Sequence, residues 1–176
     1  MAGVSTQSGP QRGPIVISVD VMGGDRGPSA VVAGLTKAVE TDGDLRFILH
    51  GPKAQIERLL AKRASLRDRC DIRDAAGVVK MTDKPSQVMR HGQNTSMWSA
   101  IEAVRNGEAT VAVSCGNTGA LMAVSMIRLR KLPGVNRPAI ACLWPSRNPQ
   151  GFTVVLDVGA EIRAEPAALP QYALLR

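Results

Sequence analysis

Apolar runs alternate with amphipathic segments along most of the chain. Continuous apolar stretches, typical of buried strands, occur at residues 15–20, 45–50, 110–113, 138–143 and 152–157, with a shorter candidate at 70–74. Apolar residues at helical spacing predict helices at residues 29–40, 53–64, 96–105, 120–129 and 166–176. Because strands alternate with helices, the pattern predicts an α/β fold with a mainly parallel sheet and helices on both of its faces.

The length and composition suit one domain. Of the 176 residues, 44% are hydrophobic, which is enough for a core, and 3% are aromatic, so aliphatic side chains must fill that core. Residues 1–14 are rich in Gly, Ser, Pro and Gln and predict a disordered leader, and residues 15–176 a single α/β domain. No apolar run is long enough for a transmembrane helix.

Cysteine and charge content narrow the function classes. Three widely spaced cysteines predict reduced thiols in a cytoplasmic protein. With no Cys-x-x-Cys pair and only two histidines, the sequence predicts neither a metal site nor a metal cofactor. The net charge of +7 favours acidic partners. Nucleic acid is not expected, since the basic residues are dispersed and aromatic side chains for base stacking are few.

The segment 114–123, Ser-Cys-Gly-Asn-Thr-Gly-Ala-Leu-Met-Ala, lies where a predicted strand turns into a predicted helix. The first N–H groups of a helix lack partners and attract anions, above all phosphate. Gly116 and Gly119 would allow a ligand to approach the backbone, and Asn117 and Thr118 add polar side chains. The alternative is a turn that only reverses the chain and caps the helix. For Cys115 a nucleophile is conceivable, but a small buried side chain is the expectation.

Two further polar loops follow predicted strands. They are residues 20–25, with Asp20, Gly23, Gly24 and Asp25, and residues 157–159, which begin with Asp157. Ligands of parallel α/β folds bind at the carboxyl ends of strands. We therefore expect these two loops and the 114–119 turn to form one site.

These loops resemble the PlsX-type phosphate acyltransferases of bacterial phospholipid synthesis. The resemblance is carried by short motifs in the order of that family, at residues 20–25 with Pro28, 84–86, 96–97, 114–123, 137–140 and 156–160. It implies a fold like that of isopropylmalate dehydrogenase and phosphotransacetylase. It also implies that an acyl group passes from acyl-carrier protein to inorganic phosphate, giving acyl phosphate, with no cofactor.

On this resemblance, residues can be assigned to roles. We expect phosphate to be cradled by Ser114, Gly116, Asn117, Thr118 and Gly119, with Asp20 and Asn117 as catalytic candidates. Further candidates for the substrate cleft are Gly23, Gly24, Asp25, Arg137 and Asp157. The implied partners are acyl-carrier protein, a second copy of the chain, and a membrane-bound glycerol-phosphate acyltransferase. The implied location is the cytoplasm, either free or peripheral at the inner membrane surface.

Two other functions stay open. Family members are longer than this chain, so it could be a truncated relative that binds an anion or a partner without catalysis. A NAD-dependent dehydrogenase of related fold is the other alternative, although the Gly-x-Gly-x-x-Gly fingerprint is missing. The sequence also departs from the family at Cys115, where Ala is usual, at residues 91–95, and at Glu161, where Asn is expected.

Overall fold

A computed structural model of the protein describes residues 15–131, 133, 135, 138–157 and 166. Several predicted features therefore lie outside the described residues. They are the leader at 1–14, the helix at 166–176 except for Pro166, Arg137, and residues 158–159. The strands are β1 (Val16–Asp20), β2 (Arg46–Gly51), β3 (Cys70–Asp74), β4 (Val111–Ser114), β5 (Ala141–Pro145) and β6 (Phe152–Leu156). The helices are α1 (Gly27–Thr41), α2 (Lys53–Leu60), α3 (Ala64–Arg67), α4 (Pro85–His91), α5 (Ser96–Arg105) and α6 (Thr118–Arg128).

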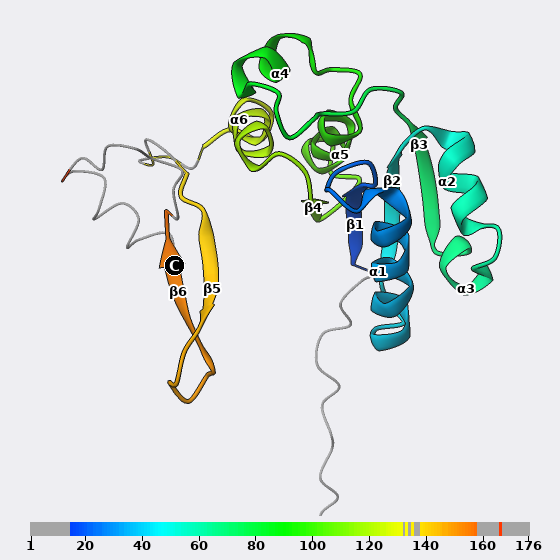
Figure 1. The fold of residues 1–176 in the computed structure, drawn as a ribbon, viewed down its shortest axis with the longest axis horizontal. Coiled ribbons are helices and arrows are strands. Elements are labelled where there is room, and N and C mark those ends of the chain that lie inside the picture. Colours follow the sequence, from blue (N-terminus) through cyan, green and yellow to red (C-terminus); the bar gives the residue numbers. More distant parts are fainter. Residues whose placement is uncertain (1–14, 132, 134, 136–137, 158–165, 167–176) are drawn as a thin grey trace, which may run out of the picture.

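Four parallel strands form the main sheet, in the order β3-β2-β1-β4 (Figure 1). In the register, Ile17 of β1 lies between Phe47 of β2 and Val111 of β4. All four carboxyl ends therefore meet at one edge, and the ends of β1 and β4 are neighbours. The predicted α/β class with a mainly parallel sheet is confirmed.

Helices cover both faces of the sheet. On one face, α1, α2 and α3 bury an aliphatic cluster with β1 and β2 that includes Val19, Val32, Leu49 and Ile56. On the other face, α5 lies against β1, β2 and β4, α6 packs onto α5 around Met97 and Ile101, and α4 packs onto α6. The core is mainly aliphatic, as the low aromatic content predicts, with Phe47 and Trp98 as its buried aromatic side chains.

The helix expected at 96–105 is confirmed as α5, the one expected at 120–129 lies at Thr118–Arg128, and three other regions differ more. The helix expected at 29–40 begins earlier, at Gly27, because Pro28 suits the first helical turn, where its missing N–H costs nothing. The helix expected at 53–64 divides into α2 and the short α3. Within residues 78–93, which show no periodic pattern, the structure has α4, again with a proline at its start.

The two strands expected after α6 exist, but they do not extend the parallel sheet. β5 and β6 pair with each other in an antiparallel hairpin that stands apart from the sheet in Figure 1. The physical reason is the short connection at residues 146–151, in which Gly151 takes a positive φ of 77°. Parallel pairing would need a crossover of about a dozen residues or more. The third expected loop therefore follows a strand of this hairpin and not a strand of the four-stranded sheet, and of its residues only Asp157 is described.

No helix among the described residues is both long and apolar enough to span a bilayer.

A buried polar cluster fixes α5 on the sheet. Ser18 of β1 donates its hydroxyl hydrogen to the Ala100 carbonyl at 2.8 Å, so it accepts the hydrogen bond from His50 Nε2, also at 2.8 Å. Neutral His50 then accepts at Nδ1 from the Ser99 hydroxyl, at 2.7 Å. Burial, and secondarily the positive charge of Arg73, lower the pKa of His50 from 6.5 to about 4.

This lowered pKa makes stability depend on pH. Between about pH 6.5 and pH 4, His50 is protonated in the unfolded chain but stays neutral in the folded protein. The free energy of unfolding should therefore fall as the pH falls through this window. The full loss amounts to about 3 kcal/mol. Urea unfolding at a series of pH values measures it. His50→Gln should flatten this slope, and His91→Gln, at the exposed second histidine of the chain, is the control. If His50→Gln and the unaltered chain showed the same slope, the pH dependence of stability could not be assigned to His50.

Candidate functional site

The loops that follow β1 and β4 meet at the carboxyl edge of the sheet. Asp20 and Ser114 are direct register partners at the ends of these strands. The Ser114 hydroxyl donates to Asp20 Oδ2 at 2.7 Å and accepts from the Gly116 N–H at 3.1 Å. The second carboxylate oxygen of Asp20 accepts from the Met22 N–H at 3.2 Å. The structure thus brings together Asp20, Ser114 and Gly116, three residues that the sequence places in one site.

Asp20 is buried, with 2% of its surface exposed, and both of its oxygens are engaged by the protein. Its carboxylate orients the Ser114 hydroxyl, whose hydrogen is therefore not available to a ligand at the same time. Asp20 therefore holds the two loops together from inside the protein, and its carboxylate does not face solvent.

Gly23 is needed because no side chain fits at its position. A Cβ there would lie 2.7 Å from Ser114 Oγ, 2.8 Å from Asp20 Oδ2 and 2.8 Å from the Gly116 nitrogen. Gly24 follows with a φ of 102°, in the left-handed region that favours glycine. Asp25 is exposed beyond them. The first loop can therefore lie against the second only because both of these residues are glycine.

Asn117 caps α6 and also holds a distant loop. Its side-chain oxygen accepts from the Ala120 N–H at 3.0 Å, a standard N-cap bond. Its amide nitrogen donates toward the carbonyl oxygens of Lys80, Met81 and Asp83, at 3.2, 3.1 and 2.9 Å. Asn117 is buried and both ends of its amide are occupied, so its geometry is that of an anchor for the 80–83 loop.

Gly116 and Gly119 are both enclosed by neighbouring side chains. A Cβ at Gly116 would lie 3.2 Å from the end of Met97, and one at Gly119 would lie 3.1 Å from Pro85. Close packing against the protein therefore explains both glycines, independently of any ligand. What the turn leaves open are the N–H groups of Thr118 and Gly119, which have no acceptor inside α6 because they belong to its first turn.

Cys115 is exposed, so the expectation of a small buried side chain at the end of this strand is wrong. β4 ends at Ser114, so Cys115 lies in the turn and not in the strand. A Cβ at Gly24 would lie 3.0 Å from Cys115 Cβ, so the two loops are close at this point.

The packing of α6 on α5 sets the position of this turn. Arg128 of α6 donates two hydrogen bonds to Glu102 of α5, at 2.6 and 3.0 Å, and its guanidinium lies 5.6 Å from the ring centre of Trp98. The Arg128 hydrogen bond is the main reason why the pKa of Glu102 is lowered. Paired charges and a stacked ring hold the C-terminal end of α6, while Asn117 holds its beginning.

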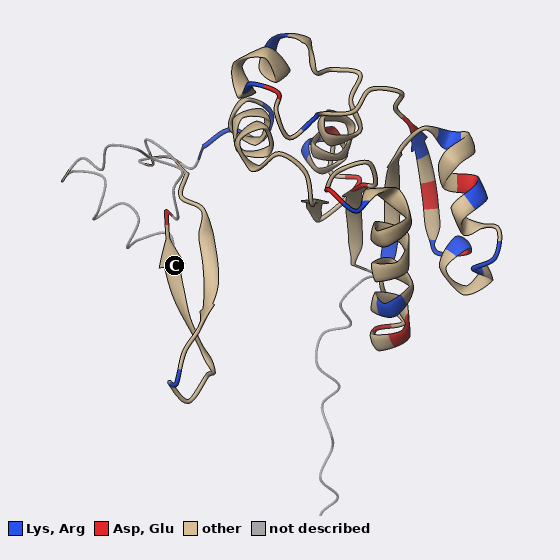
Figure 2. Cartoon of the chain, viewed as in Figure 1, with Lys and Arg blue, Asp and Glu red and all other residues tan. Residues whose placement is uncertain are grey.

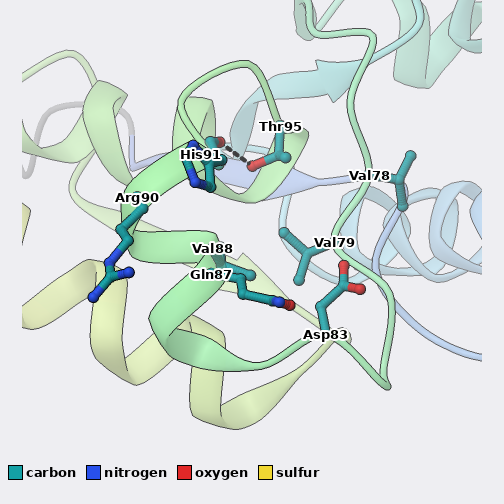
Figure 3. Close-up of a pocket in the computed structure, with 9 residues that line it drawn as sticks. Val78, Val79, Asp83, Gln87, Val88, Arg90, His91 and Thr95 are labelled. Carbon is teal, nitrogen blue, oxygen red and sulfur yellow. Dashed lines mark hydrogen bonds between the residues drawn. The ribbon is translucent and has the colours of Figure 1, made fainter.

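A cavity of about 460 Å³ lies between α4 and the segment before it, which contributes Val78, Val79 and Asp83 (Figure 3). Its walls carry Val79 and Val88 together with polar side chains that include Asp83, Gln87 and His91. Sequence reasoning missed this region because residues 78–93 show no periodicity. The available signal was the motif at residues 84–86, which here forms the start of α4.

The two remaining predicted site residues are Asp157 and Arg137. Asp157 follows β6 in the separate hairpin, where its N–H donates to the Ile140 carbonyl at 2.7 Å. Arg137 lies outside the described residues. Among the residues that the structure does describe, no group of three or more His, Cys, Asp or Glu side chains could hold a metal ion.

These features define an α/β protein in which a parallel sheet leads into a glycine turn at the N-terminus of a helix. Residues 15–175 match the family described as "Fatty acid synthesis protein". The chain therefore belongs to that family, and the relationship indicated by its short motifs is confirmed.

Relatives in three bacteria are similar to most of this chain. It is 70% identical over 161 residues to a phosphate acyltransferase of Paracoccus denitrificans, which covers 92% of this chain and 44% of that protein. Identity to a phosphate acyltransferase of Cereibacter sphaeroides is 71% over 163 residues, covering 93% and 44%. Identity to a phosphate acyltransferase of Roseobacter denitrificans is 62% over 175 residues, which covers 99% of this chain and 49% of that protein. The chain thus spans about half the length of the curated relatives it matches.

The double role of Asn117 predicts a large effect of its removal. Asn117→Ala should lower the free energy of unfolding by about 2–4 kcal/mol, because it deletes an N-cap and the bonds to the 80–83 loop. Asn117→Asp keeps the capping acceptor but sets a carboxylate against three carbonyl oxygens, so it should cost at least as much. Urea unfolding measures both changes, and tryptic cleavage after Lys80 should accelerate in both.

The matched control is Asn106→Ala, at an exposed asparagine after α5, where a change within about 0.5 kcal/mol is expected. Unchanged stability and unchanged cleavage at Lys80 in Asn117→Ala would show that the anchor is not needed.

The crowding at Gly23 predicts that even one methyl group is harmful there. Gly23→Ala should destabilise the protein by about 1–3 kcal/mol, since the new Cβ would overlap Ser114 Oγ and Asp20 Oδ2. Gly34→Ala is the control, because Gly34 is exposed in α1 with no atom within 4 Å of its Cβ position. That change should stabilise by about 0.5–1 kcal/mol through helix propensity. Thermal unfolding compares the two, and equal effects would contradict the close approach of the loops.

Proposed function

We propose that this chain supplies the phosphate-binding half of an acyltransferase that moves a fatty acyl group from acyl-carrier protein to inorganic phosphate. The observation that carries the proposal is the N-terminus of α6, with its free N–H groups held beside the Asp20–Ser114 pair at the sheet edge. Support also comes from the relatives, which are named phosphate acyltransferases, and from the family's description as a fatty acid synthesis protein.

In the proposed reaction, a phosphate oxygen attacks the carbonyl carbon of the thioester. The new C–O bond forms, negative charge develops on the carbonyl oxygen, the C–S bond breaks, and the carrier's thiolate leaves and takes up a proton. Phosphate is itself the nucleophile, so the protein must mainly position two anionic reactants and stabilise the developing oxyanion. Backbone N–H groups at a helix N-terminus suit both tasks, because they carry partial positive charge without titrating.

The residues then divide into contacts and supports. Thr118 and Gly119 would bind phosphate through their N–H groups, with the exposed Thr118 side chain adding a hydroxyl. Asp20 and Asn117 would contribute by position, since the protein occupies their polar atoms. Ser114 would hold the Gly116 backbone at a fixed position relative to Asp20. Gly23 and Gly24 would allow the loop after β1 to pack against the loop after β4.

The remaining expected partners belong to the same proposal. They are acyl-carrier protein, a second copy of the chain, and a membrane-bound glycerol-phosphate acyltransferase, at the cytoplasmic side of the inner membrane. The net charge of +7 suits acidic partners. Lys and Arg are spread over several elements, including α2 and α3, with acidic residues between them (Figure 2).

A second candidate is a binding module that holds phosphate without catalysis. The observation in its favour is that the protein itself engages the polar side-chain atoms of Asp20 and Asn117, the two catalytic candidates, and leaves the backbone N–H groups of the turn free. Acyl phosphate formation from acyl-carrier protein and phosphate separates the two candidates. Binding with turnover supports the enzyme, and binding without turnover supports the module.

Phosphate binding itself can be tested at one backbone group. Thr118→Pro removes the N–H of the first helical residue at a position where proline fits the helix, and Asn117 before it already has an extended backbone. Losing a charge-assisted hydrogen bond should weaken phosphate binding roughly tenfold or more in isothermal titration. Thr118→Ala keeps the N–H and should weaken binding less. Equal phosphate affinity in Thr118→Pro and the unaltered chain, with unfolding unchanged, would remove this turn from the site.

A further inference from the structure

A groove of about 340 Å³ runs along one side of α6, and we call it the α6 groove. Met122 and Met126 of α6 line it, together with Leu129, the residue that caps the C-terminal end of the helix. Val135, Pro138 and Ala139 line it from the following segment. Ser125 and the long side chains of Arg130 and Lys131 complete the wall, so the lining is mainly aliphatic. Its volume falls within the range of about 300–1,000 Å³ that small-molecule sites occupy.

This groove is separate from the core contact of the same helix. The core side of α6 is formed by Ala120 and Val124, which are fully buried against α4 and α5. Met122, Met126 and Leu129 are partly or fully exposed. The helix therefore has a second apolar face that the hydrophobic core of the described residues does not use.

The groove begins one helical turn beyond the proposed phosphate site, since Met122 is the first residue of α6 that lines it. Thr118 precedes Met122 by four residues and Ser125 by seven, so all three lie on one face of the helix. At a rise of 1.5 Å per residue, the distance from Thr118 to Leu129 is about 16 Å. An extended chain that starts at the free N–H groups could follow this face to the end of α6.

We propose that the α6 groove binds the acyl chain of the substrate, with the thioester carbonyl at the Thr118–Gly119 turn and the methyl end toward Leu129 and Pro138. This inference rests on the proposed function and adds to it the location of the acyl chain. An acyl chain must leave water along an apolar surface close to the reacting carbonyl, and the groove lies one helical turn from the Thr118–Gly119 turn. Two methionines in its wall suit a flexible aliphatic ligand, because their unbranched side chains adapt to it.

The test uses the 176-residue chain and palmitic acid with a photoactivatable diazirine at its methyl end, kept below the concentration at which it forms micelles. After irradiation, peptide mass spectrometry should locate saturable labels at Met126, Leu129 or Pro138. Titration with unlabelled fatty acids should show affinity rising with length until the groove is full, roughly fourfold for each methylene that is buried. Labels on the exposed hairpin residues Leu143 and Trp144 instead, or scattered labels, would overturn the proposal.

Two tryptophan substitutions on α6 form a matched pair. Met126→Trp fills the groove and should weaken palmitate binding by at least about tenfold. Ile127→Trp, at an exposed residue that does not line the groove, should leave the affinity unchanged. Equal affinities in the two variants would overturn the proposal. If Met126→Trp does not fold, the label positions in the unaltered chain decide.

Phosphate titration of the same samples distinguishes the two proposals. If phosphate binds and palmitate does not, the α6 groove is wrong and the phosphate site stands. If palmitate labels the groove and phosphate does not bind, the proposed function fails while the apolar site stands. The full-length Paracoccus relative should be labelled at the equivalent positions. If it is not, other parts of the protein cover this face, and the groove holds no acyl chain.

Discussion

The hydrogen bond from the Ser114 hydroxyl to the buried Asp20 carboxylate joins the ends of two neighbouring parallel strands, and much of the site depends on it. A buried carboxylate is costly unless its oxygens are bonded, and Asp20 meets that demand with one hydroxyl and one backbone N–H. The same hydroxyl accepts from the Gly116 nitrogen and thereby sets the direction in which the chain leaves β4. The orientation of α6 then follows from the end of the strand before it.

The two loops and the start of α6 are packed so closely that several positions have no room for a side chain, and these positions are glycine. Gly23, Gly116 and Gly119 each lie where a Cβ would meet protein atoms at 2.7–3.2 Å. A glycine-rich turn is commonly taken as a sign that a ligand approaches the backbone closely. Here the close approach is between two loops and two helices, and the ligand-facing groups are the N–H groups that these contacts leave unused. The glycines are thus needed for the shape of the turn, whatever binds there.

The sequence predicts the strands, the main helices and the meeting of two loops, because those follow from local periodicity and from the common edge of parallel strands. It does not predict the partners of Asn117, because the carbonyl groups of Lys80, Met81 and Asp83 are backbone atoms that any residue would supply. Nor does an apolar run state which strand it pairs with. For β5 and β6, the clue was the short connection that contains Asn148 and Gly151, which favours a hairpin over a crossover.

Helix α6 concentrates three different environments on one short element. Its first turn points free N–H groups toward the sheet edge, Ala120 and Val124 bury one side in the core, and Met122 and Met126 line a groove on another. Both ends are held, by Asn117 at the start and by the Arg128–Glu102 pair near the finish. A helix fixed at both ends cannot slide or rotate without breaking one of these contacts. The spatial relation between its polar N-terminus and its apolar groove is therefore constant, which is the condition for reading the two as parts of one site.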